Sequence, residues 1–105
     1  MTNPIVVTAV FFPVAGQHDN VVAALSPAIA AVHAESGCLL YAIHDAPDGS
    51  IVMVEKWESA ELLDAHEAGD AVANLTTSLG GKLERPVEVT RLVPIPVGTA
   101  EQGQL

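Results

Sequence analysis

Basic side chains are scarce in this chain. It has 4 Lys and Arg residues against 13 Asp and Glu residues in 105, which gives a formal net charge of -9. A nucleic-acid backbone or an anionic membrane is bound through clustered Lys and Arg, so neither is expected as a partner. No Lys or Arg precedes position 56, and the early apolar run over residues 5–12 is too short for a membrane span or a signal peptide. We therefore expect a cytoplasmic protein.

Cysteine is almost absent. The single Cys38 cannot form an internal disulfide, which fits a reducing compartment. Because no basic residue adjoins it in the sequence, it is expected to be a small buried apolar residue and not a nucleophile. None of the four histidines falls at a spacing typical of metal ligands, so no metal site is expected. They are His18, His33, His44 and His66.

Aromatic residues are also few, at 4% of the chain, yet half of all residues are apolar. At this length there is room for one domain with a modest core, and a small monomer leaves much of its surface in water. The apolar content therefore predicts that part of the surface is buried against a second copy, in a homodimer. We assign residues 1–105 to a single domain, with a core over about residues 4–94 and an extended or flexible tail over residues 95–105.

The clearest local pattern is a β-hairpin followed by a helix. Strands over residues 38–45 and 51–58 are rich in β-branched and large apolar residues, and the turn sequence Ala46–Gly49 (APDG) separates them. Ser59 is the predicted N-cap of a helix over residues 60–79, which Gly69 interrupts.

The remaining elements flank this hairpin. Residues 5–12 are expected to form a strand covered on both faces, and residues 87–93 a last strand. An apolar stripe at helical spacing predicts a helix over residues 20–35. The stripe consists of Val22, Leu25, Ile29 and Val32. Pro27 inside this helix predicts a kink, or a restart with Ser26 as the cap.

The predicted order is therefore β-α-β-β-α-β, which is the ferredoxin-like arrangement. This is an α+β fold, with an antiparallel sheet and two helices on one of its faces. The other face has no helix to cover it. Its apolar character, most evident in residues 5–12, is best satisfied by the same face of a second subunit under two-fold symmetry.

Candidate site residues gather where the hairpin meets the next helix. Trp57 ends the strand and His66 lies about two turns into the helix, so both are expected to line one pocket. His66 is a candidate general base near neutral pH, and the alternative is an imidazole bonded to Ser, Glu or backbone at the helix surface. Trp57 either stacks on an aromatic substrate or packs in the core.

Two further residues belong with this pair. Glu55 shares a strand face with Trp57, so it is a pocket carboxylate with a raised pKa, a partner of His66 or an Arg, or a residue bonded to the following helix. Tyr41 either donates to a substrate oxygen or is a core residue with a satisfied hydroxyl. The acids over residues 58–70 recur every three positions, a stripe that drifts around a helix, so we expect that they do not converge on a cation.

The same stretches resemble a known family. Residues 36–41 (SGCLLY), 54–59 (VEKWES) and 63–66 (LDAH) resemble the antibiotic biosynthesis monooxygenase family. The resemblance implies a dimeric α+β barrel, and members of known activity oxidise quinols, anthrones or similar aromatics with O2 and without metal or flavin. On this resemblance we assign His66 as the catalytic residue. The residues expected to bind the substrate are Trp57, Tyr41 and Glu55.

Two departures from the family bear on cofactor and substrate. Haem-degrading relatives carry an axial His further along the helix, where this chain has residues 74–77 (NLTT). Haem is therefore disfavoured, and no cofactor is expected besides O2 as co-substrate. Anthrone-oxidising relatives use an Asn, a Trp and a Tyr, of which only the Trp has an evident counterpart, Trp57.

The expected function is that of a cofactor-independent monooxygenase acting on a small aromatic, quinol or polyketide-like molecule. A phenol that loses its proton becomes an electron-rich anion that reduces O2 itself, so the protein need only supply a base, hydrogen bonds and a dry pocket. Two alternatives stay open. An isomerase or lyase of a small carbonyl compound would turn over without O2, and a non-catalytic binding module would only hold its ligand.

Overall fold

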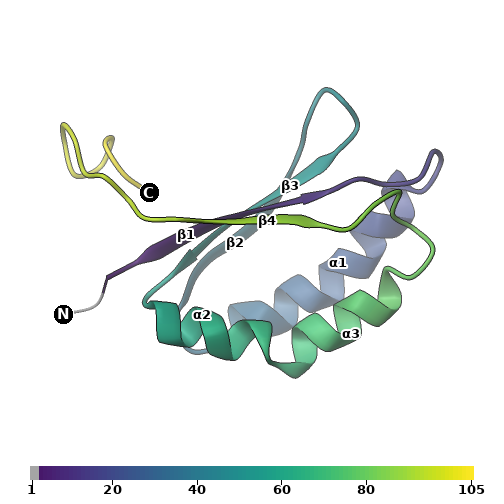
Figure 1. Ribbon diagram of the computed structural model, residues 1–105, viewed down its shortest axis with the longest axis horizontal. Coiled ribbons are helices and arrows are strands. Elements are labelled where there is room, and N and C mark those ends of the chain that lie inside the picture. The colour runs from purple at the N-terminus through teal and green to yellow at the C-terminus, as the bar shows by residue number, and fades with distance from the viewer. Residues whose placement is uncertain (1–2) are drawn as a thin grey trace.

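The computed structural model describes residues 3–105 as one four-stranded antiparallel sheet with three helices packed against one of its faces (Figure 1). The strand order is β2-β3-β1-β4, so β1 and β3 are central. The elements follow one another as β1 (Ile5–Phe11), α1 (His18–His33), β2 (Cys38–Asp45), β3 (Ile51–Trp57), α2 (Ala60–Glu67), α3 (Asp70–Ser78) and β4 (Glu88–Leu92). The predicted α+β ferredoxin-like fold is confirmed, with its second helix divided in two.

The β2–β3 hairpin forms as its turn sequence predicts. Gly49 has a φ of 88°, and the Ala46 backbone N–H donates to the Ser50 carbonyl at 3.0 Å. The Asp48 carboxylate accepts from the backbone N–H and the hydroxyl of Ser50, at 2.9 and 2.6 Å, which closes the turn. At the other end, β3 stops at Trp57, one residue earlier than predicted.

Helix α1 corrects the prediction in two ways. It begins at His18 and runs without a break through Pro27, so the predicted restart at Ser26 is wrong. Pro27 has no backbone N–H, so one hydrogen bond of the helix is missing there. Because Pro27 is exposed, the carbonyl left without this donor lies on the solvent side of the helix. The buried stripe also differs at two of its four positions. It consists of Val21, Leu25, Ala28 and Val32. Both stripes fit the helical period, so packing on the sheet decides between them.

Two caps fix α2 between β3 and α3. The Ser59 hydroxyl accepts from the Leu62 backbone N–H at 3.3 Å, which confirms the predicted N-cap. The helix ends where the Gly69 backbone N–H donates to the His66 carbonyl at 3.0 Å, and Gly69 then precedes α3. The predicted break at Gly69 is confirmed, and it places His66 in the last turn of α2.

The two faces of the sheet lie in different environments. The inner face packs on the helices and carries the core, with Val7, Met53 and Trp57 each at 1% exposure or less. Among the described elements, no helix lies over the outer face, which is therefore open (Figure 1). Its partly exposed apolar residues are Val10, Leu40, Ala42, Val52 and Val54. On the outer face of β1, Val6 is buried at 7% exposure, whereas Thr8 and Val10 are partly exposed. The prediction that the first strand is covered on both faces thus holds in full only for its inner face within one chain.

Strand β2 lies at an edge of the sheet, and two features interrupt its exposed backbone. The register shifts between Cys38 and Leu40, which is a β-bulge. The His33 Nε2–H donates to the Tyr41 backbone carbonyl at 3.0 Å. The end of α1 is thereby tied to this edge strand.

Gly37, between α1 and β2, lies against the first turn of α2. Its φ is 83°, and its carbonyl accepts from the Glu58 backbone N–H at 2.9 Å. A Cβ atom added there would lie 2.5 Å from the Cδ1 atom of Leu62, well inside van der Waals contact. A glycine at position 37 therefore allows the connection to pack on α2.

We expect Gly37→Ala to lower the free energy of unfolding by about 2–4 kcal/mol, since it adds a steric clash to a left-handed backbone penalty. The matched control is Gly49→Ala, which has a φ of 88° and open space around it. This control should cost only about 1–2 kcal/mol. Urea denaturation followed by circular dichroism measures both losses, and equal losses would show that Leu62 does not constrain position 37.

Candidate active site

His66 lies in a buried aromatic cluster. Its ring stacks on Trp57, with centroids 4.5 Å apart and planes inclined by 30°, and it meets the Tyr41 ring at 5.4 Å and 73°. His66 is 5% exposed and Trp57 is 0% exposed. The last turn of α2 thus holds the imidazole against the end of β3, where three of the predicted site residues meet.

A carboxylate outside the predicted site holds this imidazole. Glu35, in the connection between α1 and β2, accepts a hydrogen bond from His66 Nδ1 at 2.8 Å. Because a carboxylate only accepts, Nδ1 carries the proton, and the neutral ring then has its lone pair on Nε2. Glu35 was not predicted as a site residue, since no local pattern links it to a histidine 31 positions away.

Glu55 is buried beside this pair and bonds within its own strand. Its Oε1 accepts from the Trp57 Nε1–H at 3.0 Å. Burial raises the pKa of Glu55 above its ordinary value, while the Trp57 bond and the nearby His66 oppose this rise. Of the predicted alternatives, the pocket carboxylate with a raised pKa agrees with the structure. No bond from Glu55 to the following helix is found in residues 3–105.

A cavity of about 340 Å³ lies beside the cluster, on the inner face of the sheet. Tyr41, Glu55 and His66 line it together. Most of the remaining wall is apolar and includes Val7, Phe11, Val72, Leu75, Leu79 and Val89. Trp57 does not line this cavity, so of its two predicted alternatives, packing in the core is the one that agrees with the structure. Its indole is fully enclosed, with its ring on His66 and its N–H on Glu55, so it supports the two residues that do face the space.

The Tyr41 hydroxyl is the open hydrogen-bonding group of the site. No hydrogen bond to it is found within residues 3–105, and since every fully buried side-chain polar atom there has a partner, the hydroxyl is not fully buried. Tyr41 is one of the residues that line the cavity. Tyr41 is a core residue at 4% exposure, and its donation to a substrate oxygen stays a prediction. Burial raises the pKa of this phenol above its ordinary value, so it stays protonated and can donate.

The imidazole of His66 has one bonded and one unbonded nitrogen. His66 also borders a smaller hollow of about 270 Å³, which Glu35 lines as well. Nδ1 is bonded to Glu35, and Nε2 has no partner among residues 3–105; since every fully buried side-chain polar atom there has a partner, Nε2 is accessible. The site therefore offers a proton acceptor at His66, a donor at Tyr41 and a buried carboxyl at Glu55 around one mostly apolar space.

An ion pair ties α2 to β4 at the rim of the cavity. Arg91 Nη2 donates to Asp64 Oδ1 at 2.7 Å and to Glu67 Oε1 at 3.0 Å, and Glu67 lines the cavity. The prediction that the acidic stripe does not converge on a cation is wrong for this pair. Residues three apart are neighbours on a helix surface, and the drift of the stripe is small over a single step.

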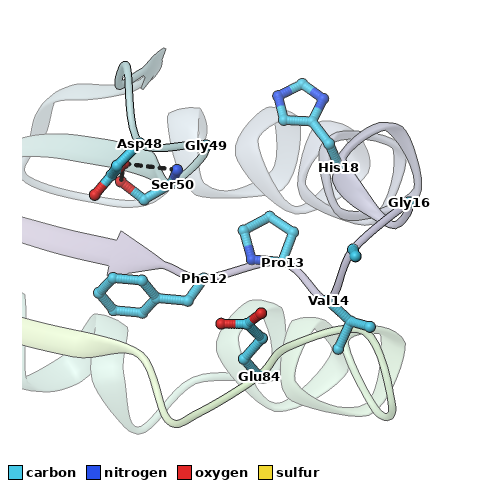
Figure 2. A pocket seen from close by; sticks show the side chains of 10 residues that line it. Phe12, Pro13, Val14, Gly16, His18, Asp48, Gly49, Ser50 and Glu84 are labelled. Carbon is cyan, nitrogen blue, oxygen red and sulfur yellow. Dashed lines mark hydrogen bonds between the residues drawn. The ribbon is translucent and has the colours of Figure 1, made fainter.

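A second hollow, of about 310 Å³, lies near the β2–β3 turn (Figure 2). Its His18 ring points away from Pro13 and Glu84, and its two nitrogens bond to Asp19 and Asp45 at 2.9 and 2.6 Å. Asp48 is already bonded to Ser50. Most polar groups here are thus engaged in the turn and the helix start, and the hollow includes none of the predicted site residues.

The other candidate groups have structural partners. His44 Nδ1 donates to the Val52 carbonyl at 3.2 Å. Cys38 is partly buried, and this burial raises the pKa of its thiol, which does not favour a reactive thiolate. Within residues 3–105, no three His, Cys, Asp or Glu side chains form a cluster able to hold a metal ion. In the same range, no helix combines the length and apolar character needed to cross a membrane.

Comparisons with known proteins agree on one family. The family model described as Antibiotic biosynthesis monooxygenase matches residues 4–76. "Putative monooxygenase Rv0793" of Mycobacterium tuberculosis is 34% identical over 101 residues, which are 95% of this chain and 100% of that protein. The solved structure of Rv0793 matches with a TM-score of 0.83 at 32% identity, over 91% of this chain and 99% of that one.

Other solved structures share the fold. Protein SO0527 from Shewanella oneidensis has a TM-score of 0.76 at 27% identity, over 89% of this chain and 94% of that one. A "putative antibiotic biosynthesis monooxygenase" from Caulobacter crescentus has a TM-score of 0.83 at 18% identity, over 90% and 92% of the two chains. At 18% identity, the likeness to the Caulobacter crescentus protein shows the fold alone.

The raised pKa of Glu55 gives a test of its environment by pH. Between the ordinary and the raised pKa the folded chain binds more protons than the unfolded chain, so the free energy of unfolding falls as the pH rises. Glu55→Gln removes this contribution and keeps an acceptor for the Trp57 N–H. We expect the stability of the wild type relative to Glu55→Gln to fall as the pH rises from the ordinary pKa of a glutamate, about 4.3, through the raised pKa of Glu55.

Urea denaturation across this pH range measures the difference. Glu61→Gln, at an exposed position on α2, controls for the loss of one carboxylate. A wild-type advantage over Glu55→Gln that grows with pH would contradict the expected burial of Glu55.

Proposed function

The chain belongs to the antibiotic biosynthesis monooxygenase family, and from this membership and the His66 cavity we propose that it is a cofactor-independent monooxygenase. Its substrate would be a small aromatic, quinol or polyketide-like molecule, and O2 would be the oxidant. The observation that carries this proposal is the buried His66, which is held at Nδ1 by Glu35 and lines the cavity.

The first step is removal of a proton from a substrate hydroxyl by His66 Nε2. The Glu35 carboxylate stabilises the imidazolium that forms, since the hydrogen bond at 2.8 Å becomes charge-assisted. The Tyr41 hydroxyl is placed to donate to the oxygen of the phenolate. The mostly apolar wall limits access of water, which makes these interactions stronger than they are in solvent.

The phenolate then reduces O2 at an activated ring carbon that carries a hydrogen. A carbon–oxygen bond forms, and the resulting peroxide takes the proton back from His66. Cleavage of the O–O bond with loss of that carbon's hydrogen leaves a carbonyl on the ring and releases one molecule of water. One oxygen atom enters the product and the other leaves as water, so the two electrons come from the substrate and no metal or flavin is required.

We expect His66→Gln to lower the rate of O2 uptake by about 10²- to 10⁴-fold with quinol or anthrone substrates, because the base is lost. The matched control is His33→Gln, which changes an exposed histidine that binds a backbone carbonyl. An oxygen electrode with a metal chelator present measures both rates. Unchanged uptake in His66→Gln would remove His66 from its role, and turnover without O2 would indicate an isomerase or lyase instead.

The open outer face of the sheet supports a second part of the proposal, that the chain forms a homodimer through this face. The face is apolar on β1, β2 and β3, and large exposed apolar patches are unusual on monomers. Further exposed apolar residues follow β4, where Val93, Ile95 and Val97 are 72%, 80% and 72% exposed. Burial of this surface against a second copy would remove it from water.

Light scattering after gel filtration is expected to give twice the chain mass of 10.9 kDa. Val54→Glu, at the centre of the outer face between Thr8 and Ala42, should shift the protein to a single chain, since it buries a charge without a partner. Leu39→Glu, at an exposed position of β2, is the control that keeps the dimer. A wild type of single-chain mass would contradict the proposed assembly.

A further inference from the structure

Carboxylates surround the His66 cavity. Glu55 lines it at 5% exposure, Glu67 lines its rim, and Glu35 lies behind the imidazole. The nearest basic residue in the described chain is Arg91, and its Nη2 is shared between Glu67 and Asp64. This pair of carboxylates more than offsets the single guanidinium charge.

The other three basic residues are engaged away from the cavity. Lys56 is on the outer face and donates to the Leu105 carbonyl, while Lys82 donates to a carbonyl of α3 at 2.7 Å. Arg85 lies 3.6 Å above the Phe12 ring. Within residues 3–105, an occupant of the cavity therefore meets a buried carboxyl and no positive side chain along its wall.

We propose that this cavity selects a neutral hydroxylated aromatic molecule of two or three rings and excludes carboxylated analogues, with Glu55 as the residue that sets the preference. The proposal deepens the proposed function and rests on the assignment of this cavity as the substrate site. A cavity of about 150 Å³ holds one benzene ring. The volume of about 340 Å³ therefore has room for two or three fused rings.

A hydroxyl group suits the polar groups that the cavity presents. Glu55 uses Oε1 for the Trp57 N–H and has its other oxygen free, and a hydroxyl can donate to the ionised carboxylate or accept from the protonated acid. A hydroxyl can also donate to His66 Nε2 and accept from Tyr41. These groups converge at one side of the space, and apolar side chains contact the rest of the rings.

A carboxylate group on the ligand has no such match. Beside an ionised Glu55 it would place two like charges close together, and because Glu55 itself is buried at 5% exposure, their repulsion is screened less than it would be at the surface. Beside a protonated Glu55 the ligand carboxylate would meet no like charge. Glu55 must then take up a proton from solution when the ligand binds, and this uptake costs more free energy as the pH rises. Either state of Glu55 disfavours a ligand that brings a net negative charge at pH 8, whereas the phenolate of the proposed reaction leaves its proton on His66 and adds no net charge to the site.

The test compares 2-naphthol with 6-hydroxy-2-naphthoate, which has the same rings and one added carboxylate. Affinities are measured by isothermal titration calorimetry at pH 8 under nitrogen, so that binding is separated from turnover. We expect the wild type to prefer the neutral ligand by about 100-fold and Glu55→Gln to reduce this preference at least about tenfold, since one buried charge is removed. Glu61→Gln, which removes an exposed charge on α2, should leave it unchanged.

Equal affinities for the two ligands, or no binding of 2-naphthol, would overturn the proposal. An unchanged preference for 2-naphthol in a folded Glu55→Gln variant would also overturn it. The wild type at 0.5 M salt gives a second test that needs no variant, because salt screens surface charges far more than buried ones. A preference for 2-naphthol that persists at 0.5 M salt supports the role of Glu55. A preference that disappears would assign the exclusion of the carboxylate to surface charge and overturn the proposal. Selective binding without O2 uptake would defeat the monooxygenase proposal and leave this one intact.

Discussion

The hydrogen bond between Glu35 and His66 is the contact on which the site depends. It joins the connection after α1 to the last turn of α2, across 31 positions of sequence, and it fixes which imidazole nitrogen has the lone pair. Without the carboxylate the buried ring would have an unsatisfied N–H, which is more costly than the net value of the bond itself. The same contact therefore stabilises the packing of two segments and fixes the orientation of the ring.

Much of the fold could be predicted because its signals are local. The turn at residues 46–49, the Ser59 cap and the break at Gly69 each depend on the conformational preferences of a few adjacent residues, and all three are confirmed. The buried stripe of α1 does not follow from local signals, since periodicity alone does not distinguish Val22 and Ile29 from Val21 and Ala28. That choice is made by the sheet on which the helix packs.

The site was harder to predict than the fold because its contacts are not local. Alternation along β3 correctly places Glu55 and Trp57 on one face, but it does not show which side chain reaches a cavity and which lies behind another ring. The same holds for Arg91, whose two partners are 24 and 27 positions away. Membership of the family identifies the region of interest, whereas the roles of single side chains follow from these tertiary distances.

The bulge in β2 and the tie from His33 to the Tyr41 carbonyl also affect how copies of the chain can associate. An edge strand with a regular row of unpaired backbone groups is a template on which further strands add without limit. Here the row is irregular at the bulge and one of the strand's carbonyls already has a donor. The β2 edge is thereby a poorer template for pairing with a strand of another chain.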